Sequence, residues 1–254
     1  MEIMSFKRKR GSMYEIELNT GDKYKVYDDV ILKYELLLNR KINKKTLDKV
    51  LEESAKMDAY FKGVRYISIK MRTKKEVENY LRRAGFLDSE VEYALKKLEK
   101  EGIIDEKKYV AAYINDAIIL SLDGPMKIRV SLGKLGIGDH LIDERLSAID
   151  EDIWKERIGK IIVKRSKVNK DSEKVFKLKT TNNLISLGYS IELIREQLSD
   201  IKIDTGEAFT RDADRIYEKL KGKFEGWELE SKFKSKMYQK GYEVDRINAY
   251  LEEK

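Results

Sequence analysis

The sequence contains no cysteine, one proline and one histidine in 254 residues. Without cysteine, the chain can form neither a disulfide bond nor a thiolate metal site. No apolar run approaches the roughly eighteen residues that a membrane-spanning helix needs. The amino-terminal stretch MEIMSFKRKR is basic, but it lacks the apolar segment of a signal peptide. We therefore expect a cytoplasmic protein with no membrane contact.

The scarcity of proline, with long stretches rich in Leu, Ile, Lys and Glu, favours helices and argues against an all-β fold. Charged residues make up 39% of the chain and hydrophobic residues 41%. This balance is too apolar for a disordered tail and too polar for one large globule, so we expect an elongated, curved body. The net charge of +7 is a mild bias toward polyanions or an acidic protein surface.

The first residues have a different pattern from the rest of the chain. Tyr14, Ile16 and Leu18 alternate with polar residues, and so do Tyr24 and Val26. Between the two runs, residues 19–22 read Asn-Thr-Gly-Asp, which is typical of a turn. The pattern predicts a β-hairpin, and residues 3–7 could add a third strand. From about residue 29 the apolar spacing becomes helical, with Leu36 and Leu37 among its positions.

An internal repeat with a period near fifty residues organises the remainder of the chain. Four glycines mark it, at separations of 51, 52 and 53 residues: Gly85, Gly136, Gly188 and Gly241. The neighbouring positions also repeat. Four residues before each glycine stands Leu or Met, one after it stands a large apolar residue, and six and ten after it stand aliphatic residues. This pattern predicts a helix that ends at a left-handed glycine cap, followed by another helix.

Capping signals place further helix boundaries. Thr73 and Glu76 have capping-box spacing, Asp88 and Asp139 stand where third helices would begin, and Pro125 suits a first helical position. A longer helix lies upstream of each pair, so each unit holds three helices. We expect an amino-terminal hairpin with helices over residues 1–53, followed by three-helix repeats over residues 54–102, 103–150, 151–203 and 204–254.

Three segments resemble motifs of the RecX family. Arg72-Thr73 through Gly85-Phe86 is similar to the first family motif, and Gly102-Ile103-Ile104-Asp105 to a later Gly-aliphatic-aliphatic-Asp stretch. The third, from Gly124-Pro125 through Gly136-Ile137, is similar to the Gly-Pro…Lys-Gly-Ile motif. The resemblance covers the whole chain, because long family members also carry the hairpin and a fourth repeat. It departs from the family pattern at Lys70, Met71, Glu106 and Leu135.

The resemblance implies a non-enzymatic regulator that binds the filament of the RecA recombinase. Such a protein modulates, and in the main inhibits, RecA ATP hydrolysis and strand exchange in homologous recombination, DNA repair and the SOS response. It also implies some affinity for single- or double-stranded DNA. We expect a monomer. A row of units each roughly 25 Å across could touch several filament protomers at once.

Basic residues cluster on the helix before the repeat glycine in the first two units. They are our candidates for contacts with the partner or DNA: Arg72, Lys74, Lys75, Arg82, Arg83, Lys127, Arg129 and Lys134. Lys75 and Arg82 are seven residues apart, as are Lys127 and Lys134, so each pair shares a helix face. The alternative is a solvated face. Cations near a helix carboxyl end, such as Arg82 and Arg83, are also favoured by the backbone dipole alone.

Other functional residues find little support in the sequence. Tyr66, Tyr80 and Tyr93 could stack on bases, although aromatic residues at helical spacing usually lie in a core. His140 stands alone, and we assign it neither catalysis nor a metal. Gly222-Lys223-Phe224 lacks the rest of a phosphate-binding loop, and Asp212 and Asp214 read as a charged helix face. We therefore predict no catalytic residue, no metal and no cofactor.

Two other functions stay open. A three-helix unit could act as a helix-turn-helix module that binds nucleic acid without RecA. Such a module would lose affinity steeply with salt and prefer particular sequences. The chain could also be a helical scaffold for some other protein, in which case no recombinase would accompany it in a pull-down.

Overall fold

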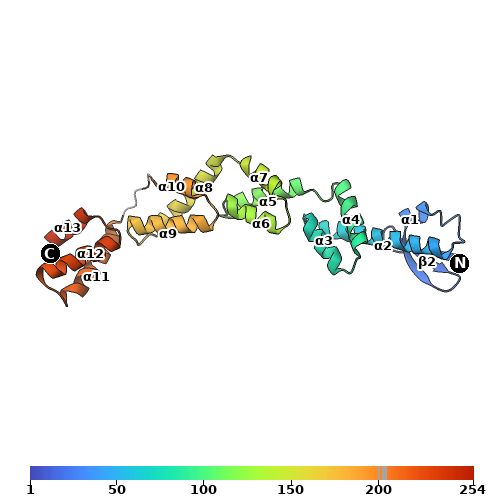
Figure 1. Ribbon diagram of the computed structural model, residues 1–254, viewed down its shortest axis with the longest axis horizontal. Coiled ribbons are helices and arrows are strands. Elements are labelled where there is room, and N and C mark those ends of the chain that lie inside the picture. Colours follow the sequence, from blue (N-terminus) through green and yellow to red (C-terminus); the bar gives the residue numbers. More distant parts are fainter. Residues whose placement is uncertain (200, 202–204) are drawn as a thin grey trace. The chain divides into compact units, whose positions relative to one another are not determined.

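The computed structural model describes residues 1–199, 201 and 205–254. Within these residues a small sheet and a short helix precede a succession of longer helices (Figure 1). The predicted mainly helical class with an amino-terminal sheet is confirmed. The helices are α1 (Asp28–Lys33), α2 (Lys44–Ile67), α3 (Lys74–Arg83), α4 (Asp88–Lys100), α5 (Glu106–Leu120), α6 (Pro125–Lys134), α7 (Asp139–Ser147), α8 (Glu151–Ser166), α9 (Glu173–Ser186), α10 (Ile191–Ser199), α11 (Gly206–Lys221), α12 (Gly226–Gln239) and α13 (Val244–Glu252).

The sheet is antiparallel, with the strand order β1 (Ile3–Arg8), β2 (Met13–Leu18), β3 (Lys23–Tyr27). Ile16 on the central strand pairs with Phe6 on one side and Tyr24 on the other. The turn between β2 and β3 uses Gly21 with φ +87°, a backbone angle that glycine adopts without steric cost. Both the predicted hairpin and its third strand are confirmed.

The segment after the sheet is less helical than its apolar spacing predicts. The helix α1 ends at Lys33, and Glu35 adopts a left-handed φ of +49°. The amide of Leu36 then donates to the carbonyl of Ile31 (3.0 Å), which turns Leu36 into the core and leaves Leu37 exposed. Periodicity alone does not reveal this tight turn.

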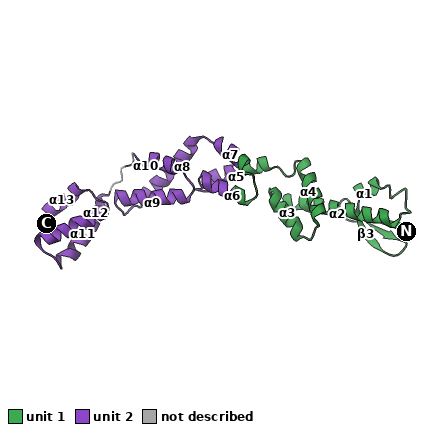
Figure 2. Ribbon diagram, viewed as in Figure 1, with its two compact units in different colours: residues 1–112, 132–141 green, residues 113–131, 142–254 purple. Residues whose placement is uncertain are grey.

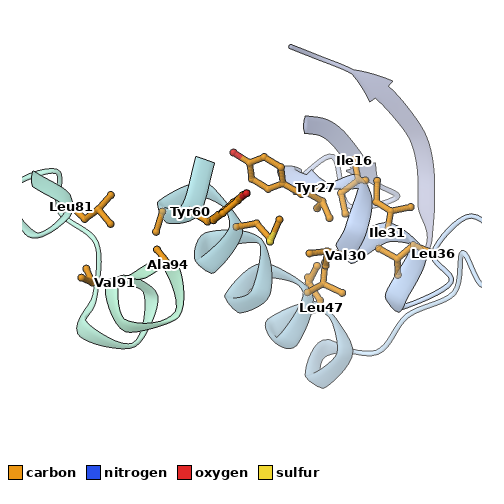
Figure 3. Close-up of a cluster of buried hydrophobic side chains, with 14 of the residues drawn as sticks. Ile16, Tyr27, Val30, Ile31, Leu36, Leu47, Tyr60, Leu81, Val91 and Ala94 are labelled. Carbon is orange, nitrogen blue, oxygen red and sulfur yellow. The ribbon is translucent and has the colours of Figure 1, made fainter. Parts of the chain in front are cut away.

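The amino-terminal sheet and the first helices share one hydrophobic core. Figure 3 shows Ile16 and Val30 near one end of this cluster, and Leu81 and Val91 at the other. The long helix α2 runs between the two ends, and the expected boundary at residues 53 and 54 falls inside it. Burial and the hydrogen bond to Glu101 (2.5 Å) raise the pKa of Tyr60 to about 12.

The chain divides into two compact units, residues 1–112 with 132–141, and residues 113–131 with 142–254 (Figure 2). After the sheet and α1, the helices follow one another in triplets whose middle helices are α3, α6, α9 and α12. The expected boundary between residues 203 and 204 lies outside the described residues. The remaining boundaries of the four predicted repeats stay a prediction.

Each middle helix ends in the same cap. The four repeat glycines have φ between +85° and +89°. In the first cap, the amide of Gly85 donates to Arg82 (3.0 Å) and that of Phe86 to Leu81 (3.3 Å), which is the hydrogen-bond pattern of a Schellman motif. The same two bonds recur at Gly136, Gly188 and Gly241. The residues four before the glycines are fully buried in every case: Leu81, Leu132, Leu184 and Met237.

The other capping predictions are also confirmed. Thr73 and Glu76 form a reciprocal capping box at the start of α3. Asp88, Pro125 and Asp139 are each the first residue of a helix. These signals are local, so the sequence alone reveals them.

The last triplet has its own core, which includes Phe209, Phe233, Met237 and Tyr250. Asp212 lies beside it and is only 6% exposed, so the expected solvated helix face is wrong at this residue. Its carboxylate accepts hydrogen bonds from Lys240 and Tyr242, both at 3.0 Å. Burial alone would raise the pKa of Asp212, but these bonds and the Arg215 charge outweigh it and lower the pKa.

No helix in the described part of the chain is long and apolar enough to cross a bilayer. His140 is exposed in the first turn of α7. Among the described residues, no three His, Asp or Glu side chains gather in a way that would hold a metal ion.

Candidate interaction surface

Arg72, directly before α3, is engaged in local packing. Its guanidinium lies 4.3 Å from the ring centre of Tyr66 and pairs with Glu76 at 3.1 Å. Tyr66 in turn stacks on Tyr80, with ring centres 4.0 Å apart and planes inclined by 7°. Because all of these side chains are partly buried against one another, they fix the start of α3.

The remaining basic residues of α3 differ in whether an acidic side chain pairs with them. Lys74 pairs with Glu99 on α4 at 2.9 Å. Arg82 pairs with Glu78 at 3.1 Å and with Asp88, and these two carboxylates raise its pKa. Arg83 is exposed and forms no ion pair with any described residue. Of the basic residues in α3, Arg83 is therefore the most available to a partner.

The basic residues of α6 likewise range from paired to unpaired. Lys127 pairs with Asp123 at 2.7 Å, one turn earlier. Arg129 holds Asp143 through two hydrogen bonds of 2.7 and 3.2 Å. Lys134, at the carboxyl end of the helix, is exposed and has no ion pair within the described part of the chain. Because its charge is unpaired, Lys134 is the basic residue of α6 most available to a partner, as Arg83 is in α3.

Lys75 lies where two successive middle helices meet. Its Nζ donates to the carbonyl oxygen of Lys134 (3.4 Å), and a Cβ placed on Gly136 would come within 2.5 Å of its side chain. The hydroxyl of Thr73 donates to the carbonyl of Leu135 at 2.8 Å. The amino end of α3 is thus joined to the carboxyl end of α6.

The same junction occurs twice more, between the start of α6 and the end of α9 and between the start of α9 and the end of α12. At the second junction the amide of Gly124 donates to the carbonyl of Leu187 (2.7 Å). At the third, the hydroxyl of Ser172 donates to the carbonyl of Lys240. In each case the acceptor directly precedes a repeat glycine. We call these three contacts the cap junctions.

The cap junctions give a second reason for glycine at these positions, in addition to the left-handed backbone angle. A Cβ on Gly188 would lie 2.4 Å from the backbone nitrogen of Lys127, and one on Gly241 would lie 2.7 Å from the Cβ of Lys174. Each junction also sets the positive end of one helix dipole against the negative end of another, which is favourable. Lys75 and Lys127, two of the predicted contact residues, therefore take part in joining the triplets.

The cap junctions are not evident from the sequence, because each one joins residues more than sixty positions apart. A partial signal exists in the hydroxyl residues Thr73 and Ser172, which begin the first and third middle helices. The second middle helix has Gly124 at this position, where a backbone amide replaces the hydroxyl.

Comparison with known proteins finds similarity to RecX proteins. A family model described as the first three-helix domain of RecX matches residues 59–98. Proteins named Regulatory protein RecX are similar over the full chain: 29% identity in Bacillus mycoides, with 96% of that protein covered, and 28% in Streptococcus uberis, with 99% covered. The family-model match, the full-length relatives and the solved structures together support a RecX family protein.

Solved RecX structures agree with the fold. A crystal structure of regulatory protein RecX aligns with a TM-score of 0.71 and 26% identity, covering 79% of this chain and 99% of that one. RecX from Lactobacillus salivarius aligns with a TM-score of 0.55 over 57% of this chain and 96% of its own, at 24% identity. The RecX resemblance of the sequence motifs is therefore confirmed.

Proposed function

We propose that this protein is a RecX-type regulator that binds the RecA filament and inhibits its DNA-dependent ATP hydrolysis and strand exchange. The similarity to regulatory RecX proteins over the entire chain carries this proposal. As a regulator of recombination and repair, it would act in the cytoplasm. In this proposal each helix triplet is one repeat unit, and the units together contact several filament protomers.

The filament contact in this proposal uses the exposed cations of the first two middle helices. Arg83 and Lys134 are exposed and have no ion pair among the described residues, and Arg82 is about half exposed. Lys75 and Arg72 act instead by fixing α3 in place. The eight predicted residues therefore divide into contact residues and positioning residues.

The direct test measures ATP hydrolysis by the cognate RecA on single-stranded DNA while this protein is titrated in. We expect hydrolysis to fall at or below one molecule per RecA protomer. Unchanged hydrolysis at saturation would contradict inhibition.

Charge reversal then locates the contact. The double variant R83E/K134E should retain its circular dichroism spectrum and lose inhibition, because both side chains are exposed. Reversing two exposed lysines that carry ion pairs elsewhere, K96E/K160E, is the matched control and should inhibit normally. Equal inhibition by both variants would show that Arg83 and Lys134 do not contribute to the contact.

The alternative of a nucleic-acid-binding module that acts without RecA makes a different prediction. Such a module would slow RecA only by covering DNA, so raising the DNA concentration would relieve the inhibition. A regulator that binds the filament loses less of its effect when DNA is in excess, because its main target is the protein.

A further inference from the structure

The helix α12 has two contrasting sides. Phe233 and Met237 are fully buried in the core of the last triplet. Trp227 and Tyr238 are 82% and 62% exposed. Eleven residues separate these two aromatic residues, close to three helical turns, so they share one side of the helix. Ser231 and Lys234 lie between them on the same side and are exposed. We call these four residues the aromatic face of α12.

Core packing does not explain the aromatic face. The other tryptophan of the chain, Trp154, is 4% exposed and is therefore a core residue. On the aromatic face the positions between the two rings carry a hydroxyl and an ammonium group, whereas a helix that docks on an apolar protein groove presents aliphatic residues at such positions. The face thus combines separate aromatic rings with a cation.

The surrounding segment is strongly basic. Residues 219–240 contain seven lysines and three glutamates, a net charge of +4 out of +7 for the whole chain. Four of these lysines have no ion pair with any described residue: Lys219, Lys223, Lys234 and Lys236. The glutamates, at positions 225, 228 and 230, stand near the Trp227 end of the helix. Of the four unpaired lysines, Lys234 and Lys236 lie toward the Tyr238 end of α12, whereas Lys219 and Lys223 precede the helix, so cations free to meet phosphates stand before and along it.

We propose that the aromatic face of α12 binds single-stranded nucleic acid, with bases stacked on Trp227 and Tyr238 and a phosphate on Lys234. Exposed aromatic rings combined with unpaired cations form the usual platform for unpaired bases. The bases of a duplex are already stacked on each other and cannot cover these rings. The proposal does not depend on RecA binding.

The length of the aromatic face suits a short stretch of single-stranded nucleic acid. Eleven residues of helix span roughly 16 Å, the length of about five nucleotides at the ~3.4 Å rise of a stacked strand. Lys234 lies between the rings along the helix axis, where the backbone that joins two stacked bases would pass. Both aromatic contacts can therefore be made by one continuous strand.

Tryptophan fluorescence tests the stacking directly, in the full-length protein without RecA. Trp227 is exposed and Trp154 is buried, so a strand that stacks on Trp227 quenches one of the two signals. We expect oligodeoxythymidylate to quench the protein, a duplex to quench it little, and W227F to remove the response. Absence of quenching, or equal quenching by duplex, would overturn the proposal.

Affinity measurements complete the test. Using anisotropy of a labelled oligodeoxythymidylate, W227A and Y238A should each weaken binding about 5- to 150-fold. K234A should reduce the slope of log affinity against log salt by about 0.7. L38A is the matched control, since Leu38 is also 82% exposed and lies outside the face. Affinities equal to that of the parent protein would overturn the proposal.

A protein partner on this face is the other possible result. If RecA without DNA shifts the Trp227 emission and the oligonucleotide does not, the face binds protein and the proposal is wrong. This outcome is distinct from failure of the regulator function, which the ATPase titration measures independently.

Discussion

Gly85 and Gly188 hold the same place in two helix triplets, yet their surroundings differ. Both have φ +89° and both end a middle helix in a Schellman motif. A Cβ on Gly85 would meet no atom within 4 Å, whereas a Cβ on Gly188 would lie 2.4 Å from the backbone of Lys127. The comparison separates two reasons for glycine: the local turn requires it at all four caps, and the close approach of helices requires it only at the cap junctions.

The largest expected effect comes from adding one methyl group at each of these glycines. G188A combines left-handed strain with displacement of the Lys127 backbone and should lower the free energy of unfolding by about 3 kcal/mol. G85A adds only the strain, about 1 kcal/mol. Urea denaturation followed by circular dichroism measures both. Equal losses would mean that the cap junction at Gly188 contributes nothing beyond the turn.

A second comparison concerns the two aspartates of α11. D212A should cost about 2 kcal/mol, because it leaves the buried hydroxyl of Tyr242 without its acceptor. D214A should cost less, since the side chain of Asp214 is 52% exposed although it accepts a hydrogen bond from Tyr250 (2.6 Å). Thermal denaturation of the two variants checks the order. A greater loss for D214A would contradict the role given to burial.

The hydroxyl cap junction at Thr73 should contribute less. T73A removes both the helix cap and the hydrogen bond to Leu135, at a cost of about 1 kcal/mol. T73S keeps the hydroxyl and should restore most of the stability. The same urea titration measures both variants. If T73S is no more stable than T73A, the methyl packing of Thr73 matters and the hydrogen bond does not.

The smallest expected effect is a dependence of the folding stability on pH in the acidic range. The pKa of Asp212 in the folded chain lies below its ordinary value of 3.8, so its carboxylate stabilises the fold above that value. This contribution is lost as the pH falls from 3.8 through the lowered pKa. The difference in stability between the parent protein and D212N should therefore shrink over this range. A difference that grows as the pH falls would contradict the direction of the shift.

Local chemistry explains how much of the fold the sequence predicts. The hairpin turn, the capping box of Thr73 and the four glycine caps each depend on residues within about six positions, so their patterns are visible in the chain. The turn at Glu35 has no such signature, because a glutamate with positive φ is uncommon. Apolar spacing alone therefore predicts a helix at Leu37, where the structure has an exposed turn residue.

The candidate surface was harder to predict because exposure and pairing depend on distant residues. Nothing near Lys75 in the sequence indicates that Gly136 packs against it. Likewise, Arg83 resembles Arg82 in sequence, but Arg82 is paired with Glu78 and Asp88 whereas Arg83 is exposed. The positions of the cations were predictable, and their availability became visible only in the structure.

Co-sedimentation with RecA filaments tests the central claim most directly. The variant W227A/Y238A is the protein to use, since it removes the proposed contact with bare DNA and leaves Arg83 and Lys134 intact. We predict that it pellets with RecA filaments on single-stranded DNA and stays in the supernatant with DNA alone. If it stays in the supernatant when the filaments pellet, the assignment as a filament-binding regulator is contradicted.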